Sequence, residues 1–364
     1  MNGTGAQPCR AGCRALRSAP VGPDDVTTDW LSTMLGGEIG AVEHERIGDG
    51  LVGMNLRVRL LDAAPALPSS VVIKLPSPDP TSRATGIALR NYEREVRFYL
   101  DIAPTVDIRV PHCHHGEWDE GSGDFVLVLE DMSPAEQGNQ ITGCSIEHAA
   151  AAVAELAKLH GPRWDDPTLH EVDWLSRRTG PDDVTQLVGL WSMVLPGFTA
   201  VYSKHLDAEQ QDLVVRFGAV LGDWIDGRSG PLTVTHGDYR LDNLLFATPA
   251  GGPPVTAVDW QTPGHGPPVA DLAYFLGAGP VSTDRSAHER ELVDSYASAL
   301  EAYDVQVDPG WLWEQYRREA FAGVVMAVIA SQIVGGSERS EAMFAAMATR
   351  HLRHALDLDS LSLV

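Results

Sequence analysis

Alternating apolar and polar residues predict a β-sheet in the N-terminal third of the chain. Leu56, Val58 and Leu60 alternate with arginines across residues 55–61, a period of two that is typical of a half-buried strand. Glycines at positions 36 and 37 predict the end of a short helix. We expect strands at residues 42–47, 71–75 and 125–129, and helices at 24–36 and 84–100.

Apolar residues recur at helical spacing in the rest of the chain. Ser145 can cap a helix over residues 146–160, and Gly161-Pro162 can stop it. The segment 165–230 contains Trp174, Trp191 and Trp224. Most of its tryptophans are expected to pack in a core, and one or two to line a pocket. Three further helices are predicted at residues 287–303, 309–334 and 337–358.

Two short apolar segments, Leu232–Thr235 and Val255–Val258, enclose the most polar pattern in the chain. Asp238 and Asn243 stand between them, and Asp259 follows the second segment. Mg²⁺ prefers oxygen ligands and is usually held by one or two protein groups together with substrate phosphates. The pattern therefore favours an enzyme that uses a magnesium nucleotide. Gly251–Pro254 is expected to be a hairpin turn.

Gly48, Gly50 and Gly53 form a GxGxxG motif, which by itself is weak evidence. A dinucleotide-binding turn would open a helix. Here the alternation at 55–61 predicts a strand, so a flap over nucleotide phosphates between two antiparallel strands is favoured. A glycine-rich hairpin that binds nothing is the alternative.

Lysine is rare, occurring only at Lys74, Lys158 and Lys204. Lys74 lies in the apolar strand Val71–Leu75, a pattern that matches the kinase lysine on the nucleotide phosphates. The alternative is a lysine that reaches solvent from a strand edge. Glu95 is the favoured partner of Lys74, and Glu93 is the second candidate.

Two other polar segments have less specific patterns. The histidines of Pro111–His115 are packed too tightly for a structural zinc site, so a polar loop is expected there. Glu130, Asp131 and Met132 follow the apolar strand 125–129 and are predicted to form a hinge whose backbone reaches a nucleotide base. A plain strand end is the alternative.

Composition excludes several classes of protein. The net charge of −23 and the absence of a basic stripe argue against nucleic acid and anionic membrane as partners. Four cysteines without a CxxC motif favour the cytoplasm. Residues 1–20 lack an apolar signal region and are expected to be a disordered leader or to follow a start codon placed too early. The apolar run 320–334 is too short to span a membrane and predicts a buried helix.

Taken together, these motifs resemble the aminoglycoside phosphotransferase-like family of the protein-kinase-like fold, to which choline, ecdysteroid and hydroxyacyl-CoA kinases are related. The resemblance covers about residues 24–335. Its most specific part is His236-Gly-Asp238-Tyr-Arg-Leu-Asp-Asn243 followed by Val258-Asp259-Trp260.

The resemblance implies an α+β, bilobal fold. A nucleotide-binding lobe at residues 21–132 would contain an antiparallel sheet with one long helix, and a mostly helical lobe would span 133–364. It also implies roles for single residues. Asp238 would be the catalytic base, Arg240 a cation near the transferring phosphate, Asn243 and Asp259 the magnesium ligands, His236 a brace of the catalytic loop, and Asp271 an acid that ties the loop backbone; Asp242 is expected to face solvent.

The implied activity is ATP-dependent phosphorylation of a hydroxyl on a small molecule, with GTP as an open alternative. Trp260 and the short interval from Asp259 to Asp271 favour a small acceptor over a protein. Acidic residues in the segment 165–226 favour an aminoglycoside or another amino sugar. A neutral sugar, a secondary-metabolite alcohol or a hydroxyacyl-CoA stays open, as does an inactive nucleotide-binding scaffold.

Overall fold

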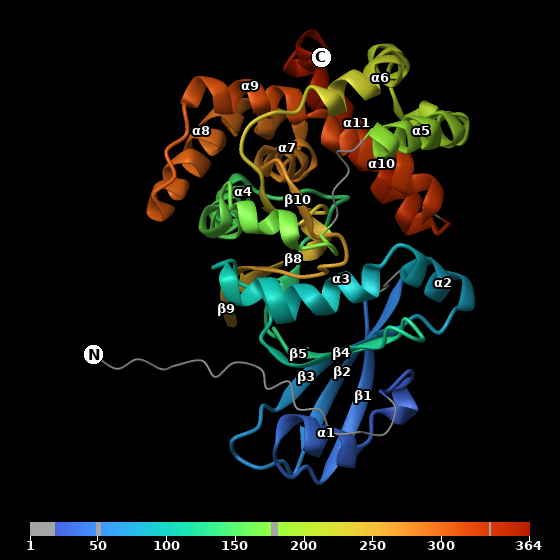
Figure 1. The fold of residues 1–364 in the computed structure, drawn as a ribbon, viewed down its shortest axis with the longest axis vertical. Helices are drawn as coiled ribbons and strands as arrows, with labels where there is room; N and C mark the ends of the chain where they lie inside the picture. Colours follow the sequence, from blue (N-terminus) through green and yellow to red (C-terminus); the bar gives the residue numbers. More distant parts are fainter. Residues whose placement is uncertain (1–18, 49–51, 176–180, 335) are drawn as a thin grey trace. The chain divides into compact units, whose positions relative to one another are not determined.

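The computed structural model describes residues 19–48, 52–175, 181–334 and 336–364. It divides into two compact units, and Figure 1 shows their elements. The first unit comprises Met1–Pro104 and Val110–Met132, and the second comprises Thr105–Arg109 and Ser133–Val364. Most of the expected leader at residues 1–20, and Gly50 of the glycine motif, lie outside the described residues.

The first unit is built on a five-stranded sheet with the order β1-β2-β3-β5-β4. All neighbouring strands are antiparallel. The predicted strands are confirmed as β1 (Ala41–Ile47), β2 (Gly53–Leu61), β3 (Ser70–Pro76) and β5 (Phe125–Glu130). Leu56, Val58 and Leu60 are buried in the apolar core of this unit, as their alternation predicts.

The segment Cys113–Trp118 forms the edge strand β4, so the expectation of a polar loop at 111–115 is wrong for its last residues. Cys113 is buried, whereas His114 and His115 are partly exposed. An edge strand has one side without a neighbouring strand, and it therefore tolerates polar side chains that a central strand would not.

The single long helix expected at residues 84–100 is divided in two. α2 (Pro80–Ala88) begins with Asp79 as its N-cap, and α3 (Asn91–Arg97) continues as one π-helical turn, Phe98–Ile102. Arg90 separates them with a left-handed backbone, φ 58°. A left-handed residue interrupts the helical hydrogen-bond ladder, and no glycine marks the position in the sequence. The other helix of this unit, α1 (Thr28–Leu35), ends at Gly36 with φ 72°, as predicted.

The second unit is mostly helical (Figure 1). The predicted helix at 146–160 is confirmed as α4 (Ile146–His160), with Ser145 as its N-cap. The predicted helix at 309–334 is two helices, α9 (Pro309–Glu319) and α10 (Phe321–Ile333), that meet at Ala320. The remaining α-helices of the described residues in this unit are α5 (Pro181–Tyr202), α6 (Ala208–Asp226), α7 (Pro268–Ala278), α8 (Ser282–Leu300) and α11 (Glu338–Asp357).

Two small sheets lie within the second unit. One contains β6 (Glu136–Gln137), β8 (Leu244–Thr248) and β9 (Gly251–Ala257), and the other pairs β7 (Thr233–Thr235) with β10 (Gly264–Gly266). Gly251–Pro254 belongs to β9, so the hairpin turn is not where we expected it. Gly251 and Gly252 have φ of 125° and 107°, and these unusual values let the strand begin directly after the turn.

Large aromatic side chains are part of the core of the second unit. Trp174, Trp191 and Trp224 are each 2% exposed, which confirms the packing expected of most of them. The expectation that one or two line a pocket stays a prediction. By length and composition alone, one helix in the described part of the chain, Asp182–His205, could cross a membrane, and 17% of its most apolar window is buried.

Candidate functional site

The loop that follows β7 is fixed by one buried carboxylate from α7. Asp271 accepts a hydrogen bond from the backbone nitrogen of His236 at 2.6 Å and from that of Gly237 at 3.0 Å. Gly237 has φ 77°, and a Cβ there would lie 2.4 Å from the carbonyl oxygen of Thr262. Glycine is therefore required at this position. The contacts of Asp271 are those that the resemblance implied.

His236 connects the two chain segments that carry the predicted site. Its Nδ1 accepts a hydrogen bond from the backbone nitrogen of Asp238 at 3.3 Å. Its Nε2 lies 3.1 Å from the carbonyl oxygen of Val258 and must donate to it, which defines the tautomer of the neutral ring. Trp260 packs against the ring with centroids 4.3 Å apart. The imidazole therefore braces the loop, as implied.

Asp238 lies at the centre of a set of polar contacts. The Nε of Arg240 is 3.1 Å from each carboxylate oxygen, and the amide nitrogen of Asn243 is 2.8 Å from Oδ2. The hydroxyl of Tyr274 donates to Oδ1 at 2.7 Å. A partly accessible carboxylate with fixed orientation can act as a general base toward a hydroxyl group.

Asn243 and Asp259 flank the paired strands β8 and β9. Leu244 pairs with Ala257, and the backbone nitrogen of Val258 donates to the carbonyl oxygen of Asn243 at 3.0 Å. This register brings the start of β8 beside the end of β9. Asp259 has a left-handed backbone with φ 65°, a conformation that aspartate adopts more readily than most residues.

The residues of this hairpin end fit a magnesium ion. Because the amide nitrogen of Asn243 binds Asp238, its oxygen is the atom left for a cation. Asp259, the other predicted ligand, carries a carboxylate, and its oxygens are of the hard type that Mg²⁺ prefers. The described residues contain no group of three or more His, Cys, Asp or Glu side chains placed to hold a metal. A pair of protein ligands completed by phosphate oxygens is the usual arrangement for Mg²⁺.

Asp242 is buried, and the expectation that it faces solvent is wrong. Its carboxylate accepts from the backbone nitrogen of Gln140 and from Arg240, both at 2.9 Å. Burial acts to lower the pKa of Arg240, but the carboxylates of Asp238 and Asp242 outweigh it and raise this pKa. Asp242 therefore anchors the cation that lies on the predicted base.

The first unit contains the predicted lysine and its partner. Lys74 on β3 forms a buried ion pair with Glu95 on α3. Glu93, the second candidate, instead binds Arg90 at 2.7 Å and Arg97 at 3.3 Å. The preference for Glu95 is confirmed as a contact. The assignment of Lys74 and Glu95 to a nucleotide stays a prediction.

The glycine motif lies between two antiparallel strands, as predicted. Ile47 at the end of β1 is paired with Asn55 in β2. Gly48 has φ 68°, and a Cβ on Gly53 would be 3.3 Å from the carbonyl oxygen of Leu75. Tyr92 on α3 donates a hydrogen bond to the carbonyl oxygen of Val52. This anchor of the loop is a residue that sequence reasoning missed.

The predicted hinge residues have side chains that stabilise the first unit. Glu130 accepts from the backbone nitrogen of His112 at 2.9 Å. Asp131 accepts from the Nε of Arg57 at 2.9 Å and from the hydroxyl of Ser70 at 2.7 Å. Met132 is buried. A role of their backbone groups toward a base stays a prediction.

Sequence reasoning also missed residues that hold the catalytic loop from a distance. The side chain of Gln140 accepts from the backbone nitrogen of Leu241 at 3.0 Å and donates to the carbonyl oxygen of Ala278 at 2.9 Å. Arg350 donates to the carbonyl oxygens of Gln140 and Ala278. Tyr274 belongs to the same group. These single residues stand on separate elements, so no local motif could have revealed them.

The chain has the protein-kinase-like fold. It resembles choline kinase from Cryptosporidium parvum Iowa II with a TM-score of 0.55 and 13% identity, over 89% of this chain and 91% of that one. It resembles the GDP complex of aminoglycoside 2'-phosphotransferase-IIIa with a TM-score of 0.54 and 15% identity, over 88% of this chain and 95% of that one. It resembles a microcompartment-associated aminopropanol kinase with a TM-score of 0.51 and 14% identity, over 89% of this chain and 95% of that one.

A family model gives the more specific result. The model of the phosphotransferase enzyme family matches residues 55–318, which is more than half of the chain. The protein therefore belongs to this family and is a phosphotransferase. A search of curated proteins finds no match.

Proposed function

We propose that the protein transfers the γ-phosphate of ATP or GTP to a hydroxyl group of a small molecule, such as an aminoglycoside, an amino sugar or a similar metabolite. The observation that carries the proposal is the geometry around Asp238. Its carboxylate is oriented by Arg240, Asn243 and Tyr274. Asn243 and Asp259 flank the same end of the hairpin formed by β8 and β9.

Each residue has a distinct part in the proposed reaction. Asp238 accepts the proton of the acceptor hydroxyl as its oxygen bonds to the γ-phosphorus, while the bond from that phosphorus to the β,γ-bridging oxygen breaks and ADP or GDP leaves. Asn243 and Asp259 would hold Mg²⁺, which would neutralise charge on the phosphates. Lys74, oriented by Glu95, is assigned to the nucleotide phosphates, and Arg240 to the transferring phosphoryl group. Tight positioning with little covalent chemistry is what phosphoryl transfer requires.

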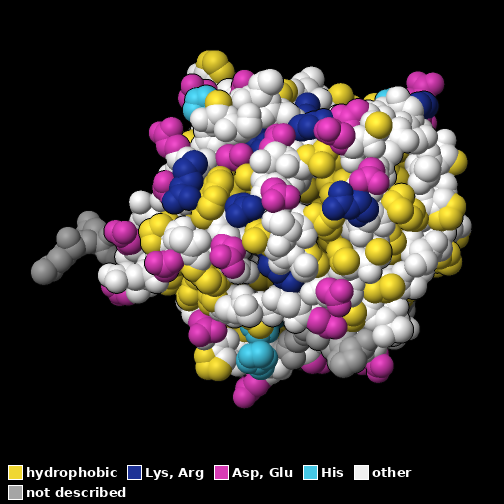
Figure 2. Space-filling view, turned by 90° about the horizontal axis from the view of Figure 1, so that it is seen from above, with side chains coloured by type: hydrophobic (Ala, Val, Ile, Leu, Met, Phe, Trp, Pro, Cys, Tyr) yellow, Lys and Arg dark blue, Asp and Glu magenta, His cyan; other side chains and the backbone are white. Residues whose placement is uncertain are grey.

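Support for an acceptor that contains nitrogen comes from the relatives by fold. Their names identify choline, aminopropanol and an aminoglycoside as acceptors. The acids of residues 165–226 give weaker support, because several have structural roles. Asp207 caps α6 and binds Arg353, and Asp212 pairs with Arg216. On the face that Figure 2 draws, acidic and basic side chains are interspersed rather than gathered.

The test is phosphoryl transfer from Mg-ATP and Mg-GTP to a panel of aminoglycosides, amino alcohols, neutral sugars and hydroxyacyl thioesters. Turnover of at least one acceptor is expected, and Asp238→Asn should lower its rate by about 10²–10⁴-fold. Asp212→Asn is the matched control, because Asp212 is exposed on α6 and should leave the rate unchanged. Unchanged activity in Asp238→Asn, or no transfer to any acceptor, would contradict the proposal.

The charge of the acceptor has its own test. For a cationic acceptor the KM should rise with ionic strength, because salt screens attraction to carboxylates. The comparison uses the fastest acceptor of the panel and a neutral analogue that lacks the amine. Equal salt dependence for the two would show that the amine contributes nothing to binding.

A further inference from the structure

Tyr274 is the one contact of the Asp238 carboxylate, among those described above, that comes from outside the catalytic loop. Arg240 and Asn243 stand two and five positions after Asp238, whereas Tyr274 stands 36 positions away on α7. Its hydroxyl is 2.7 Å from Oδ1, and the amide nitrogen of Asn243 is 2.8 Å from Oδ2. The two carboxylate oxygens therefore have different donors, which defines the rotation of the carboxylate plane.

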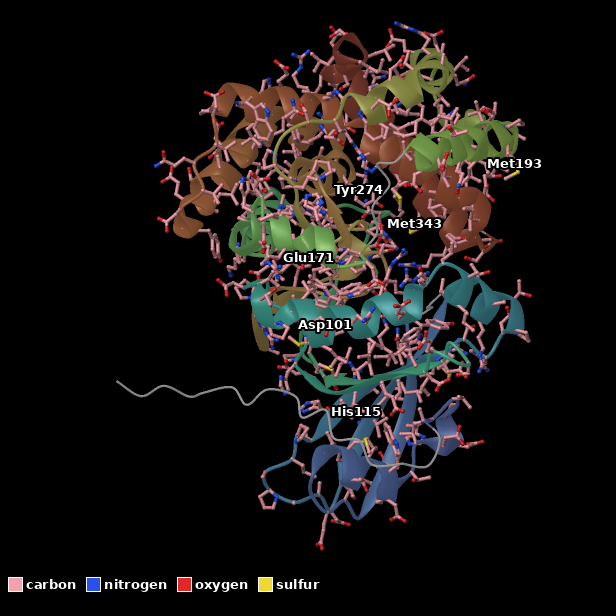
Figure 3. All side chains as sticks on the ribbon, viewed as in Figure 1. Asp101, His115, Glu171, Met193, Tyr274 and Met343 are labelled. Atoms are coloured by element: carbon pink, nitrogen blue, oxygen red, sulfur yellow. The ribbon has the colours of Figure 1, made fainter. Side chains whose placement is uncertain are left out.

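The phenol of Tyr274 is built to donate. The side chain is buried in the second unit, where Figure 3 labels it. Burial, and then the negative charge of Asp238, raise the pKa of Tyr274 well above its usual value. The hydroxyl group thus keeps its proton at neutral pH. A protonated phenol facing a carboxylate can only donate to it.

The ring of Tyr274 is in turn held by His351 on α11. The two rings are stacked, with centroids 5.3 Å apart and planes 9° from parallel. His351 is fully buried, and in the described structure neither of its ring nitrogens has a hydrogen-bond partner. Burial lowers its pKa well below the usual value, so the ring is an uncharged plate.

Two glycines leave the space that this plate occupies. A Cβ on Gly277 of α7 would lie 2.5 Å from Nδ1 of His351, and a Cβ on Gly323 of α10 would lie 2.1 Å from the same ring. Any side chain at either position would have to displace the imidazole. Three helices therefore define where His351 lies, and His351 limits where Tyr274 can lie.

We propose that Tyr274 is a positioning residue for phosphoryl transfer, which orients the Asp238 carboxylate through its hydroxyl and is itself held by the His351 ring. The proposal rests on the proposed role of Asp238 as the base. A base must present one oxygen to the acceptor hydroxyl, and a displacement of about 1 Å can cost on the order of 10²-fold in rate. Tyr274 opposes such a displacement without touching the acceptor.

The first experiment compares Tyr274→Phe with the unaltered protein. The probes are Mg-ATP with water as acceptor and Mg-ATP with the fastest alcohol of the panel. We expect kcat to fall by about 10- to 100-fold with both acceptors, because positioning of the base acts on the chemical step. The KM for ATP and the KM for the alcohol should stay unchanged. A purely structural role would change the melting temperature and leave kcat of the folded fraction unchanged.

Tyr316→Phe is the matched control. Tyr316 is also buried, and its hydroxyl also donates to a carboxylate, that of Glu289, at 3.0 Å. The substitution removes the same group from a similar environment and should lower stability without lowering kcat. If Tyr316→Phe lowers kcat as much as Tyr274→Phe does, the effect is not specific to Asp238 and the proposal is wrong.

A double substitution separates this inference from the proposed function. In Asp238→Asn, the further change Tyr274→Phe should have little effect on the residual rate, because Tyr274 acts through Asp238. If Asp238→Asn abolishes turnover and Tyr274→Phe alone stays within about 2-fold of the unaltered rate, only the inference fails, since positioning would require a larger loss. If Asp238→Asn retains full turnover, the proposed function itself fails.

The His351 contact has a separate pair of variants. His351→Phe preserves an uncharged aromatic plate and should keep kcat, whereas His351→Ala removes the plate and should lower kcat toward that of Tyr274→Phe. This pair also serves if Tyr274→Phe does not fold. Equal kcat in the two His351 variants would overturn the inferred support of Tyr274 by stacking.

Discussion

Single carboxylates fix the predicted catalytic loop through the hydrogen bonds that they accept. The two oxygens of Asp271 bind two successive backbone N–H groups. Asp242 binds one backbone N–H and the guanidinium of Arg240, and a second guanidinium, that of Arg339, lies 3.6 Å away. The sequence shows these acids but not their partners. Asp242 lies one position before Asn243 in a polar segment, so nothing local distinguishes it from a solvated acid.

We expect Asp271→Asn to destabilise the protein by about 1–3 kcal/mol. An amide offers one acceptor oxygen where the carboxylate offers two, so either the backbone nitrogen of His236 or that of Gly237 loses its partner. Urea unfolding measures the difference. Asp304→Asn is the control, because Asp304 is exposed. A change no larger than that of the control would show that the two backbone contacts do not support the fold.

The buried pair of Lys74 and Glu95 leads to an asymmetric prediction. Lys74→Met leaves the carboxylate of Glu95, which has no exposed surface, without its cation, and should cost about 3–5 kcal/mol. Adding Glu95→Gln should recover part of that loss, because the unpaired charge is removed. Unfolding in guanidinium chloride measures both variants.

The exposed pair of Arg59 and Glu43, 3.9 Å apart, supplies the comparison for the buried one. Arg59→Met should change stability by less than about 1 kcal/mol, because exposed ion pairs contribute little. If the double variant of Lys74 and Glu95 is as unstable as the sum of the two single variants, the residues are not coupled as the structure indicates.

Secondary structure was predictable where a period and a terminus signal occur together. Residues 146–160 have both a helical pattern and the cap Ser145, and the helix has the predicted bounds. Residues 84–100 have the pattern, but the interruption at Arg90 has no signal, because arginine is not a residue type that marks a left-handed backbone in a sequence. Ala320, between α9 and α10, likewise carries no sequence signal for the end of a helix.

The N-cap of α4 can be tested directly. Ser145 accepts a hydrogen bond from the backbone nitrogen of His148, and Ser145→Ala should cost about 1 kcal/mol of stability. Ser192→Ala is the control, because Ser192 is exposed on α5 and its hydroxyl bonds the carbonyl oxygen of Val188 within the helix. Its effect should stay within about 0.5 kcal/mol. Equal effects on the melting temperature would contradict the capping role.

The same limits apply to the candidate site. Motif spacing was sufficient to group Asp238, Asn243 and Asp259 at one loop and one hairpin, because these residues lie close together in the chain. Asp271 binds the loop backbone from 35 positions away, and only the family resemblance indicated it. The roles of these residues in phosphoryl transfer stay predictions. Motif spacing was insufficient for Tyr274 and Gln140, whose contacts span 36 and 101 positions. Long-range contacts depend on how helices pack, and packing is not visible in the pattern of a single segment.

The acidity of the protein and its buried histidines give opposite pH dependences of stability. With a net charge of −23 at pH 7, self-repulsion weakens as pH falls toward the sequence pI of about 4.8. His351 and His354 act in the other direction. Burial is the main reason why the pKa of each is lowered. As pH falls, the unfolded chain therefore binds protons that the folded chain does not. The charged and titratable groups around them are Arg285, Glu289, Tyr316, Arg350 and Asp357.

We therefore predict that the free energy of unfolding contains a term that is absent above about pH 6.5, the value for an unfolded histidine, and that lowers stability as pH falls below it. Each histidine contributes up to about 1.4 kcal/mol per pH unit until its depressed folded-state pKa is reached.

His351→Phe removes one such contribution but leaves the repulsion among surface acids nearly unchanged. Subtracting the two curves, measured by urea unfolding between pH 5 and 8, isolates the histidine. The difference should be flat above pH 6.5 and slope below it. Parallel curves for the unaltered protein and His351→Phe would mean that His351 is protonated equally in the folded and unfolded chain, which a fully buried ring without hydrogen-bond partners in the described structure does not allow.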